Sequence, residues 1–479
     1  MMMASVINLK DILYALTGQT NPKLDIPVSK AVIDSRQASE GSLFIAFPGE
    51  HVDGHDYVQA AFDNGAKIAL VEKDLPEGLN VIDLRAEYFQ PHFLNQVTAP
   101  VCLRVENTLA ALHQIAIHWR KEHPIRIIGI TGSVGKTSTK ELTAVLLSQK
   151  FAVLKNPGNR NNVIGLPLTL LELDSHHQCA VLEMGFYVPG DIRLLCDIAQ
   201  PQVGVITNIG TVHAERAGSQ ENIARGKAEL VEALPPAPDG VAILNMDDPR
   251  VSAMRSKTAA KIFSYGVNEK SDLMARDIQT HELEGLSCVL SYQGEDHPVH
   301  SPLMGAFSVY TILCATAVAL TEGLDWEMIK TGLANSQLDL RLHPLPLADG
   351  TVIIDDTYNA SPASTLAALE FLQTFSDRRV AILGDMLELG QYERAGHYAV
   401  GASVVNAADV LILVGERTLM IAEAAVDRGF KQDRIHWFAD SEQAALHVCG
   451  LIQPGDRVLI KGSNSMRMDR ILRTLAGGE

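Results

Sequence analysis

The strongest constraint on the fold of this chain is the alternation of short apolar segments with helix-length segments between residues 126 and 245. The apolar segments read RIIGIT, CAVLEMG, VGVITNIG and VAILN, and stretches such as KTSTKELTAVLLSQ and ENIARGKAELVEAL separate them. Strands that alternate with crossover helices form a parallel sheet with both faces covered. The pattern therefore predicts a central domain of the parallel α/β class.

The same pattern starts again near residue 335. Four apolar segments separated by helical stretches, TVIIDDTY, RVAILGDM, VLILVG and RVLIKG, predict a second, Rossmann-like parallel domain. The first hundred residues carry shorter strand-like segments, AVIDSR, SLFIAF and KIALVE, which are typical of a small α/β unit. A chain of 479 residues exceeds what one hydrophobic core supports. We therefore predict three α/β domains, at residues 1–102, 103–334 and 335–479.

The charge balance limits the partners that the chain can bind. The formal net charge is −17 and the pI is about 5.4, whereas nucleic acids and anionic membranes attract positive surfaces. We therefore expect no nucleic-acid partner. An anionic small molecule would have to be bound by local positive groups, namely helix N-termini, a few basic side chains and bound metal.

An uncharged segment at residues 301–321, SPLMGAFSVYTILCATAVALT, is long enough to span a bilayer. Pro302, Gly305 and several hydroxyl residues interrupt it, and no basic cluster flanks it. These features favour a buried helix over a membrane span, so we expect no stable membrane insertion.

The cysteines and the start of the chain indicate the compartment. The chain starts MMMASVINLKDILYALTG, without the basic and apolar regions of an export signal. The cysteines are scattered without C-x-x-C spacing, which fits reduced thiols in the cytoplasm. They are Cys102, Cys179, Cys196, Cys288, Cys314 and Cys449.

A glycine-rich loop, GITGSVGKTSTKE, lies between a predicted strand and a predicted helix at residues 129–141. Its spacing departs from the strict Walker pattern, because Ile130 stands six residues before Lys136. Glycines let backbone N–H groups turn onto phosphate oxygens, and the helix that follows presents its positive end. Lys136 would reach the β and γ phosphates of ATP, and the Thr137 hydroxyl would bind Mg²⁺. The residues predicted to contact ATP here are Gly132, Ser133, Val134, Gly135, Lys136, Thr137 and Ser138.

The segment TGSVGKT resembles the phosphate loop of the Mur ligases, and further motifs follow in that family's order over residues 31–472. NPGNRNNVIGLPLTLL is similar to the family's asparagine-rich loop, which implies that Asn161 and Asn162 lie near the nucleotide-sugar substrate. A solvated turn before a helix is the alternative interpretation of these asparagines.

The resemblance also implies a metal site. Glu183 ends one predicted strand, and Asn208 and His213 follow another, so these side chains should face the crevice of the phosphate loop. Lys227 alone would be interpreted as a solvated helical lysine beside Glu229. In the family, a lysine at this position is carbamoylated and becomes an anionic oxygen ligand for Mg²⁺.

The resemblance thus implies four catalytic residues, namely Lys136, Glu183, His213 and Lys227. It implies metal ligands at Thr137, Glu183, His213 and carbamoylated Lys227, with two Mg²⁺ ions expected. Asn208 is expected to contact ATP.

Three stretches in the last domain, IIDDTYNASPAS, LGDMLELG and IKGSNSMRM, look like signatures of the family member that adds a dipeptide. They imply that Asp356 contacts ATP and that Tyr358 and Asn359 line the substrate site. Arg341 would reach the ATP phosphates, since a guanidinium suits bidentate phosphate contact. In the first domain, Ser35 and Arg36 are similar to the uridine-diphosphate end of the family's substrate site.

One segment departs from the family pattern. Relatives show Gly-Arg-His-Asn with another Asn three residues on, whereas this chain reads GAFSVYT from Gly305 to Thr311. Phe307, Ser308 and Thr311 replace the His and the two Asn, so the family's adenine contacts do not transfer to this chain. Two of the replacements keep hydroxyl groups that can hydrogen-bond.

The activity that the resemblance implies is ATP-dependent amide-bond formation. D-alanyl-D-alanine would be joined to UDP-N-acetylmuramoyl tripeptide through an acyl phosphate, by a monomeric enzyme. The alternatives are another ligase of the superfamily, either third-residue-adding or folylpolyglutamate-type, and a phosphate-loop switch that signals by shape. Acceptor choice separates the ligases, whereas a switch would respond to a protein partner.

Overall fold

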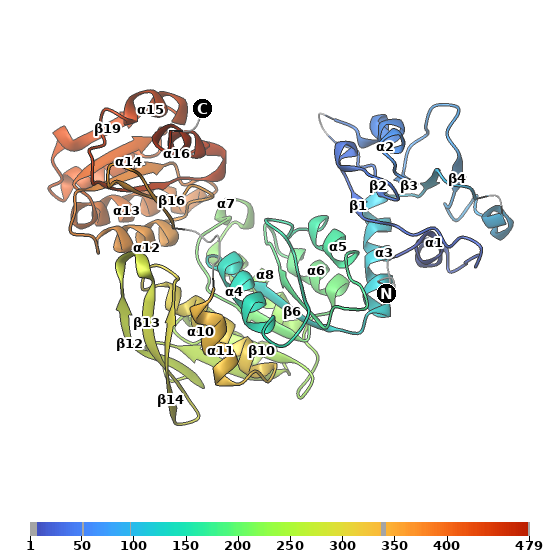
Figure 1. Cartoon of the computed structure of the whole chain (residues 1–479), viewed down its shortest axis with the longest axis horizontal. Coiled ribbons are helices and arrows are strands. Elements are labelled where there is room, and N and C mark those ends of the chain that lie inside the picture. The colour runs from blue at the N-terminus through green and yellow to red at the C-terminus, as the bar shows by residue number, and fades with distance from the viewer. Residues whose placement is uncertain (1–6, 50–51, 96, 337–341, 478–479) are drawn as a thin grey trace. The chain divides into compact units, whose positions relative to one another are not determined.

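The computed structural model of the chain describes residues 7–49, 52–95, 97–336 and 342–477. The chain divides into two compact units. The first comprises residues 1–129, 151–185 and 193–202, and the second comprises residues 130–150, 186–192 and 203–479. Figure 1 follows the chain from its N-terminal elements in blue to its C-terminal elements in red.

The first unit contains a five-stranded sheet in the order β1-β2-β3-β5-β4, and every strand pair in it is parallel. The strands are β1 (Ala31–Val32), β2 (Leu43–Ile45), β3 (Ile68–Val71), β4 (Val81–Asp83) and β5 (Val101–Arg104). β2 and β3 are buried along their whole length, as expected of parallel strands covered on both faces. The predicted domain boundary at residue 102 falls within β5, and the three domain boundaries stay predictions.

The remaining elements of the first unit are mostly helical. An asparagine caps the start of α1 and of α3, since Asn8 accepts from Asp11 N and Asn107 accepts from Ala110 N. The strands β7 and β8 pair in parallel. These elements are α1 (Leu9–Thr17), α2 (Val58–Asp63), α3 (Thr108–Glu122), β7 (Val153–Lys155), α5 (Gly165–Leu170) and β8 (Cys179–Glu183). Both β6 (Arg126–Thr131) and α6 (Asp191–Ala199) contribute residues to both units.

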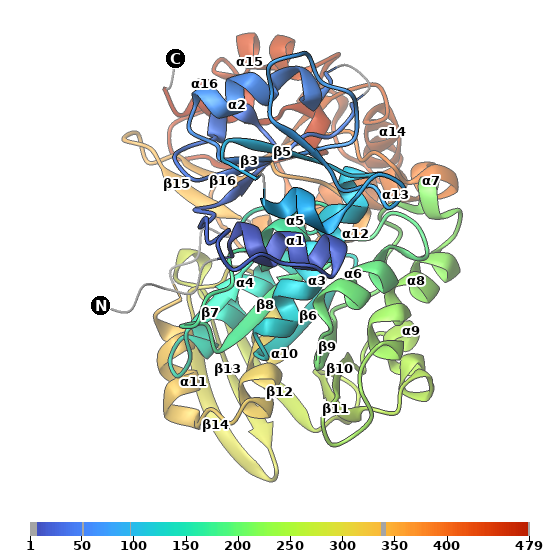
Figure 2. The same ribbon diagram turned by 90° about the vertical axis from the view of Figure 1, so that its right-hand side faces the viewer.

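In the second unit, six strands lie in the order β14-β13-β12-β11-β10-β9. They are β9 (Val203–Ile206), β10 (Val241–Asn245), β11 (Lys261–Gly266), β12 (Leu273–Thr280), β13 (Leu286–Tyr292) and β14 (Glu295–Ser301). Pairing is parallel from β9 to β12, which confirms the predicted parallel sheet, and antiparallel from β12 to β14. The antiparallel strands, yellow in Figure 2, were not predicted from the sequence.

Several α-helices belong to this part of the second unit. They are α4 (Lys136–Leu147), α7 (Ala214–Ala217), α8 (Gln220–Glu232), α9 (Pro249–Ser252), α10 (Ser308–Thr321) and α11 (Trp326–Ala334). The uncharged segment forms α10, which is buried over most of its length and packs against α4. This confirms the predicted buried helix.

Within the described residues, no helix has both the length and the apolar character needed to cross a membrane.

The C-terminal part of the second unit has a six-stranded sheet in the order β15-β16-β20-β17-β18-β19. Only the edge pair, β15 with β16, is antiparallel. The strands are β15 (His343–Pro346), β16 (Val352–Asp356), β17 (Arg379–Gly384), β18 (Val410–Val414), β19 (Ile435–Phe438) and β20 (Arg457–Lys461). The helices are α12 (Pro362–Leu372), α13 (Glu393–Ala407), α14 (Leu419–Asp427), α15 (Ser441–Val448) and α16 (Asp469–Leu475).

Alternate residues of this sheet enter two separate cores. In β17, Ala381 and Leu383 belong to the core with α12, α13 and α14, whereas Val380 and Ile382 belong to the core with α15 and α16. A strand's side chains alternate between faces, so burial on both faces requires the continuous apolar runs seen in the sequence. The predicted parallel α/β architecture of this part is confirmed.

Candidate functional site

The phosphate loop turns sharply between β6 and α4. Gly132 has φ +152° and Gly135 has φ +84°, conformations that other residues rarely adopt. A Cβ atom added to Gly132 would lie 1.8 Å from Thr207 Oγ1 at the end of β9. Gly132 is therefore required for the loop to approach the strand so closely.

Asn208 holds the loop in this shape. Its side-chain amide donates to Val134 O (2.9 Å) and accepts from Val134 N (3.0 Å), and its backbone oxygen accepts from Ser133 N (2.9 Å). The Thr207 hydroxyl also donates to Val134 O (2.7 Å). The loop is thus fixed by β9 and the residues that follow it.

The first turn of α4 supplies the phosphate-binding groups. Lys136 begins the helix, and Thr137 and Ser138 follow it. Backbone N–H groups in the first turn of a helix have no partner within the helix, so this end attracts anions. The Lys136 ammonium lies over the loop and donates to Gly132 O (2.9 Å) and Ser133 O (3.2 Å).

Lys227 in α8 is buried next to the same loop. Its side chain is only 2% exposed, its ammonium donates to Gly132 O (2.8 Å), and it lies 4.9 Å from the centre of the Phe186 ring. The solvated ion pair expected of an ordinary helical lysine is therefore not what the structure shows. Carbamoylation of Lys227 stays a prediction.

His213 lies just before α7, and Nδ1 of its imidazole contacts Glu388 Oε2 at 2.6 Å. Burial lowers the pKa of His213 below its ordinary value, although the Glu388 carboxylate opposes the shift. The positive charges of Lys136 and Lys227 also contribute to lowering this pKa. Of the four predicted catalytic residues, Lys136 and Lys227 meet at one group, because both donate to Gly132 O.

Glu183 and the asparagine-rich loop lie together in the first unit. Asn161 Nδ2 donates to Glu183 Oε1 (2.8 Å), and Asn156 both donates to and accepts from the backbone of Glu183. Asn162 Oδ1 instead accepts from Ile164 N and Gly165 N at the start of α5. Asn162 therefore stabilises the local turn, which matches the alternative interpretation of this motif. The substrate roles of both asparagines stay predictions.

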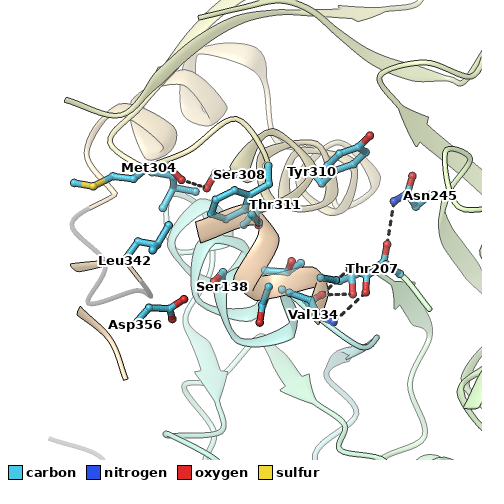
Figure 3. A pocket seen from close by; sticks show the side chains of 18 of the residues that line it. Val134, Ser138, Thr207, Asn245, Met304, Ser308, Tyr310, Thr311, Leu342 and Asp356 are labelled. Carbon is cyan, nitrogen blue, oxygen red and sulfur yellow. Dashed lines mark hydrogen bonds between the residues drawn. The ribbon is translucent and has the colours of Figure 1, made fainter. Parts of the chain in front are cut away.

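A cavity of about 260 Å³ opens beside the phosphate loop (Figure 3). The segment that departs from the family pattern forms one wall, with Phe307, Ser308 and Thr311 at the start of α10. Ser138 and Asp356, both predicted to contact ATP, also line it. The other lining residues are Val134, Gly135, Thr139, Thr207, Asn208, Asn245, Tyr265, Leu303, Met304, Tyr310, Leu342, Ala363, Ser364 and Ala367.

Asp356 gives this cavity a buried carboxylate. It ends β16, and its Oδ2 accepts from Lys461 Nζ (2.5 Å), the residue paired with it on β20. Its other oxygen, Oδ1, is buried and has no hydrogen-bond partner within the described ranges. A buried acceptor without a partner is costly, so Oδ1 is suited to accept from a hydroxyl or amino group of a ligand.

The remaining predicted residues are spread over the chain. Tyr358 is half exposed, and Asn359 lies next to it, its backbone oxygen accepting from Lys461 (2.8 Å). Ser35 is buried, whereas the Arg36 side chain is exposed and pairs with Asp34. Arg341 lies outside the described residues.

The proposed metal ligands are mixed in type. Among the residues that the structure describes, no group of three or more His, Cys, Asp or Glu side chains could hold a metal ion. The set expected from the resemblance combines the Thr137 hydroxyl, the Glu183 carboxylate and a carbamoylated Lys227 with the His213 imidazole. The three oxygen ligands are of the type that suits Mg²⁺.

Several residues of the site were not found by sequence reasoning. Thr207 read as an ordinary strand-end residue, and Asn245 ends β10 without a recognisable motif. Lys461 lies in IKGSNSMRM, which was recognised only as a family signature. Glu388 lies in LGDMLELG, which was recognised only as a family signature. Its partnership with His213 spans 175 residues, so no local pattern reveals it.

Together, these features define a class of protein. A glycine-rich loop at the junction of a parallel strand and a helix, with a cavity and a buried lysine beside it, characterises a phosphate-loop nucleotide-binding α/β protein.

Comparisons with known proteins place the chain within that class. Three family models match it: "Mur ligase family, catalytic domain" at residues 28–120, "Mur ligase middle domain" at 130–319 and "Mur ligase, glutamate ligase domain" at 340–464. The chain is 37% identical over 467 residues to the UDP-N-acetylmuramoyl-tripeptide--D-alanyl-D-alanine ligase of Synechocystis, covering 96% of this chain and 94% of that relative. The chain belongs to the Mur ligase family.

Solved structures agree with this assignment. A crystal structure of MurF from Acinetobacter baumannii is 30% identical, with 98% of each chain covered and a TM-score of 0.84. A crystal structure of the MurF ligase from Thermotoga maritima in complex with ADP is 27% identical, covers 94% of this chain and 97% of that chain, and has a TM-score of 0.77.

Replacing Asn208 tests whether the loop depends on its side chain. In Asn208→Ala, the backbone N–H and carbonyl of Val134 each lose a hydrogen bond, so we expect ADP to bind about tenfold more weakly. Isothermal titration calorimetry measures this. Asn406→Ala, at an exposed position of α13, is the control. Unchanged ADP affinity in Asn208→Ala would contradict the role of this side chain.

Proposed function

We propose that the chain joins D-alanyl-D-alanine to UDP-N-acetylmuramoyl tripeptide and converts ATP to ADP and phosphate. This proposal rests on the similarity, over 96% of the chain, to a protein named UDP-N-acetylmuramoyl-tripeptide--D-alanyl-D-alanine ligase. The phosphate loop, which Asn208 holds in shape, and the cavity beside it support the proposal. The loop can bind the phosphates of ATP, and the cavity can hold the rest of the nucleotide.

The reaction proceeds in two steps under this proposal. A terminal carboxylate oxygen of the tripeptide attacks the γ phosphorus of ATP, the bond to the bridging oxygen breaks, and ADP leaves. The free amine of the dipeptide then attacks the acyl carbon, loses a proton, and displaces phosphate. Both steps depend on alignment and on stabilising negative charge at the transferring phosphoryl group.

Residues around the loop have distinct roles in this scheme. Lys136 holds the β and γ phosphates at the N-terminus of α4, and Asp356 accepts from a hydroxyl or amino group of the nucleotide. Thr137, His213, Glu183 and carbamoylated Lys227 would hold Mg²⁺. When bound, the metal neutralises charge on the phosphoryl oxygens. Two Mg²⁺ ions, a monomeric state and a cytoplasmic location belong to the same proposal.

The alternatives differ in what controls ATP cleavage. A ligase for the third residue, or one of the folylpolyglutamate type, would require a different acceptor and amine. A nucleotide switch would respond to a protein partner instead, and Glu183, His213 and Lys227 would then tolerate substitution.

The reaction is tested by ADP release from the purified protein with Mg²⁺ and ATP. We expect ADP release only when UDP-N-acetylmuramoyl tripeptide and D-alanyl-D-alanine are both present. The tripeptide is supplied in two forms, one ending in lysine and one ending in diaminopimelate. Mass spectrometry should show a product heavier than the tripeptide substrate by the dipeptide less water. Release with a single amino acid would indicate another ligase, and release without either substrate would indicate a switch.

The carbamate at Lys227 has its own test. Protein equilibrated with ¹³C-bicarbonate should show a carbamate carbon resonance, since a neutral amine adds CO₂ to give an anionic oxygen ligand. Lys227→Arg, which keeps the charge but cannot form this carbamate, should lack the resonance. The same spectrum from both proteins would exclude carbamoylation at Lys227.

A further inference from the structure

The motif LGDMLELG at residues 383–390 has no role in the function described so far, yet it supplies the direct partner of His213. Glu388 Oε2 lies 2.6 Å from His213 Nδ1. The two residues are 175 positions apart in the chain, so the fold of the second unit creates this contact.

The local backbone is shaped around the contact. His213 (φ +65°) and Glu388 (φ +61°) both adopt the left-handed conformation, which non-glycine residues seldom do. Glu215 N donates to Glu388 O (3.2 Å), which fixes the two segments against each other. A Cβ atom on Gly390 would lie 3.0 Å from Glu215 Cα, so the close approach also depends on that glycine.

The charged surroundings are asymmetric. Arg216 Nη2 donates to Glu388 Oε1 (3.2 Å), so each carboxylate oxygen of Glu388 has a different partner. The rings of Tyr187 and His213 pack in a T-shaped arrangement, with ring centres 5.0 Å apart.

A carboxylate on one ring nitrogen determines what the other nitrogen can do. When Nδ1–H donates to Glu388, the neutral imidazole keeps its lone pair on Nε2, the form that binds a metal ion. Such carboxylate partners orient the ring and increase the basicity of the ligand. We propose that Glu388 is a positioning residue, which holds His213 with Nε2 ready for a divalent cation.

This inference rests on the metal role of His213 in the proposed function. It adds that the cation's affinity depends on a residue of the C-terminal sheet region, beyond β17. Contact between α7 and the η6 turn (Gly390–Tyr392) therefore completes the metal site and does more than pack the surface.

Manganese binding tests the inference without measuring ligase activity. Full-length protein in bicarbonate buffer is titrated with Mn²⁺, and free Mn²⁺ is followed by electron paramagnetic resonance. We expect Glu388→Ala to bind about tenfold more weakly than the wild type. Glu388→Gln should be intermediate, because its amide oxygen still accepts from Nδ1–H but carries no charge.

Two control variants separate positioning from packing. Glu215→Gln removes an exposed carboxylate from the same helix, and Arg216→Ala removes the other partner of Glu388. Both should bind Mn²⁺ as the wild type does, and thermal unfolding checks that every variant is folded. Unchanged affinity in Glu388→Ala and Glu388→Gln, or an equal loss in Arg216→Ala, would overturn the inference. Absence of Mn²⁺ binding by the wild type would instead overturn the proposed metal site itself.

Discussion

The hydrogen bonds between Asn208 and Val134 are the interaction on which the candidate site depends. They fix a loop of small residues against the end of β9, in a shape that Gly132 alone permits at its closest point. This shape sets where α4 begins, and so where Lys136 and Thr137 stand. The same loop offers the carbonyl of Gly132 to both Lys136 and Lys227. The phosphate loop thus positions both Lys136 and Lys227 through one backbone carbonyl.

The second unit also shows how distant segments contribute to one site. Asp356 ends a strand of the C-terminal sheet, and a buried ion pair with Lys461 holds it at the cavity beside the loop. Breaking such a pair by removing one partner costs about 3–5 kcal/mol, because the other charge stays buried. Glu388 reaches His213 from the same part of the chain. The C-terminal region therefore supplies Asp356 to the cavity and Glu388 to His213, as well as its own hydrophobic core.

Some parts of this structure could be predicted from the sequence, for clear physical reasons. Buried parallel strands need continuous apolar runs, so β6, β9, β17 and β18 were visible as such in the sequence. The glycines and lysine of the phosphate loop were visible because their chemistry requires a fixed local spacing. The α10 helix was recognised as buried because its small and hydroxyl residues break the apolar run.

Other parts could not be predicted, because they depend on contacts between distant residues. The strands β12 to β14 are half exposed and carry mixed polar residues, so their pattern was too weak to recognise. The residue pattern alone indicated a solvated helical lysine at Lys227, and only the family resemblance singled it out. Its burial follows from how α8 packs beside the loop. The Asn162 side chain accepts from the backbone in the turn before α5, a contact that the motif did not reveal, and its substrate role stays a prediction.

The central claim is that the γ phosphate of ATP is transferred to the carboxylate of the tripeptide substrate. Tripeptide substrate labelled with ¹⁸O in its terminal carboxylate, turned over with ATP and D-alanyl-D-alanine, tests this claim most directly. An acyl phosphate intermediate predicts that a labelled oxygen is found in the released phosphate, because the carboxylate oxygen leaves with the phosphoryl group. Unlabelled phosphate, or label found in AMP, would contradict the claim.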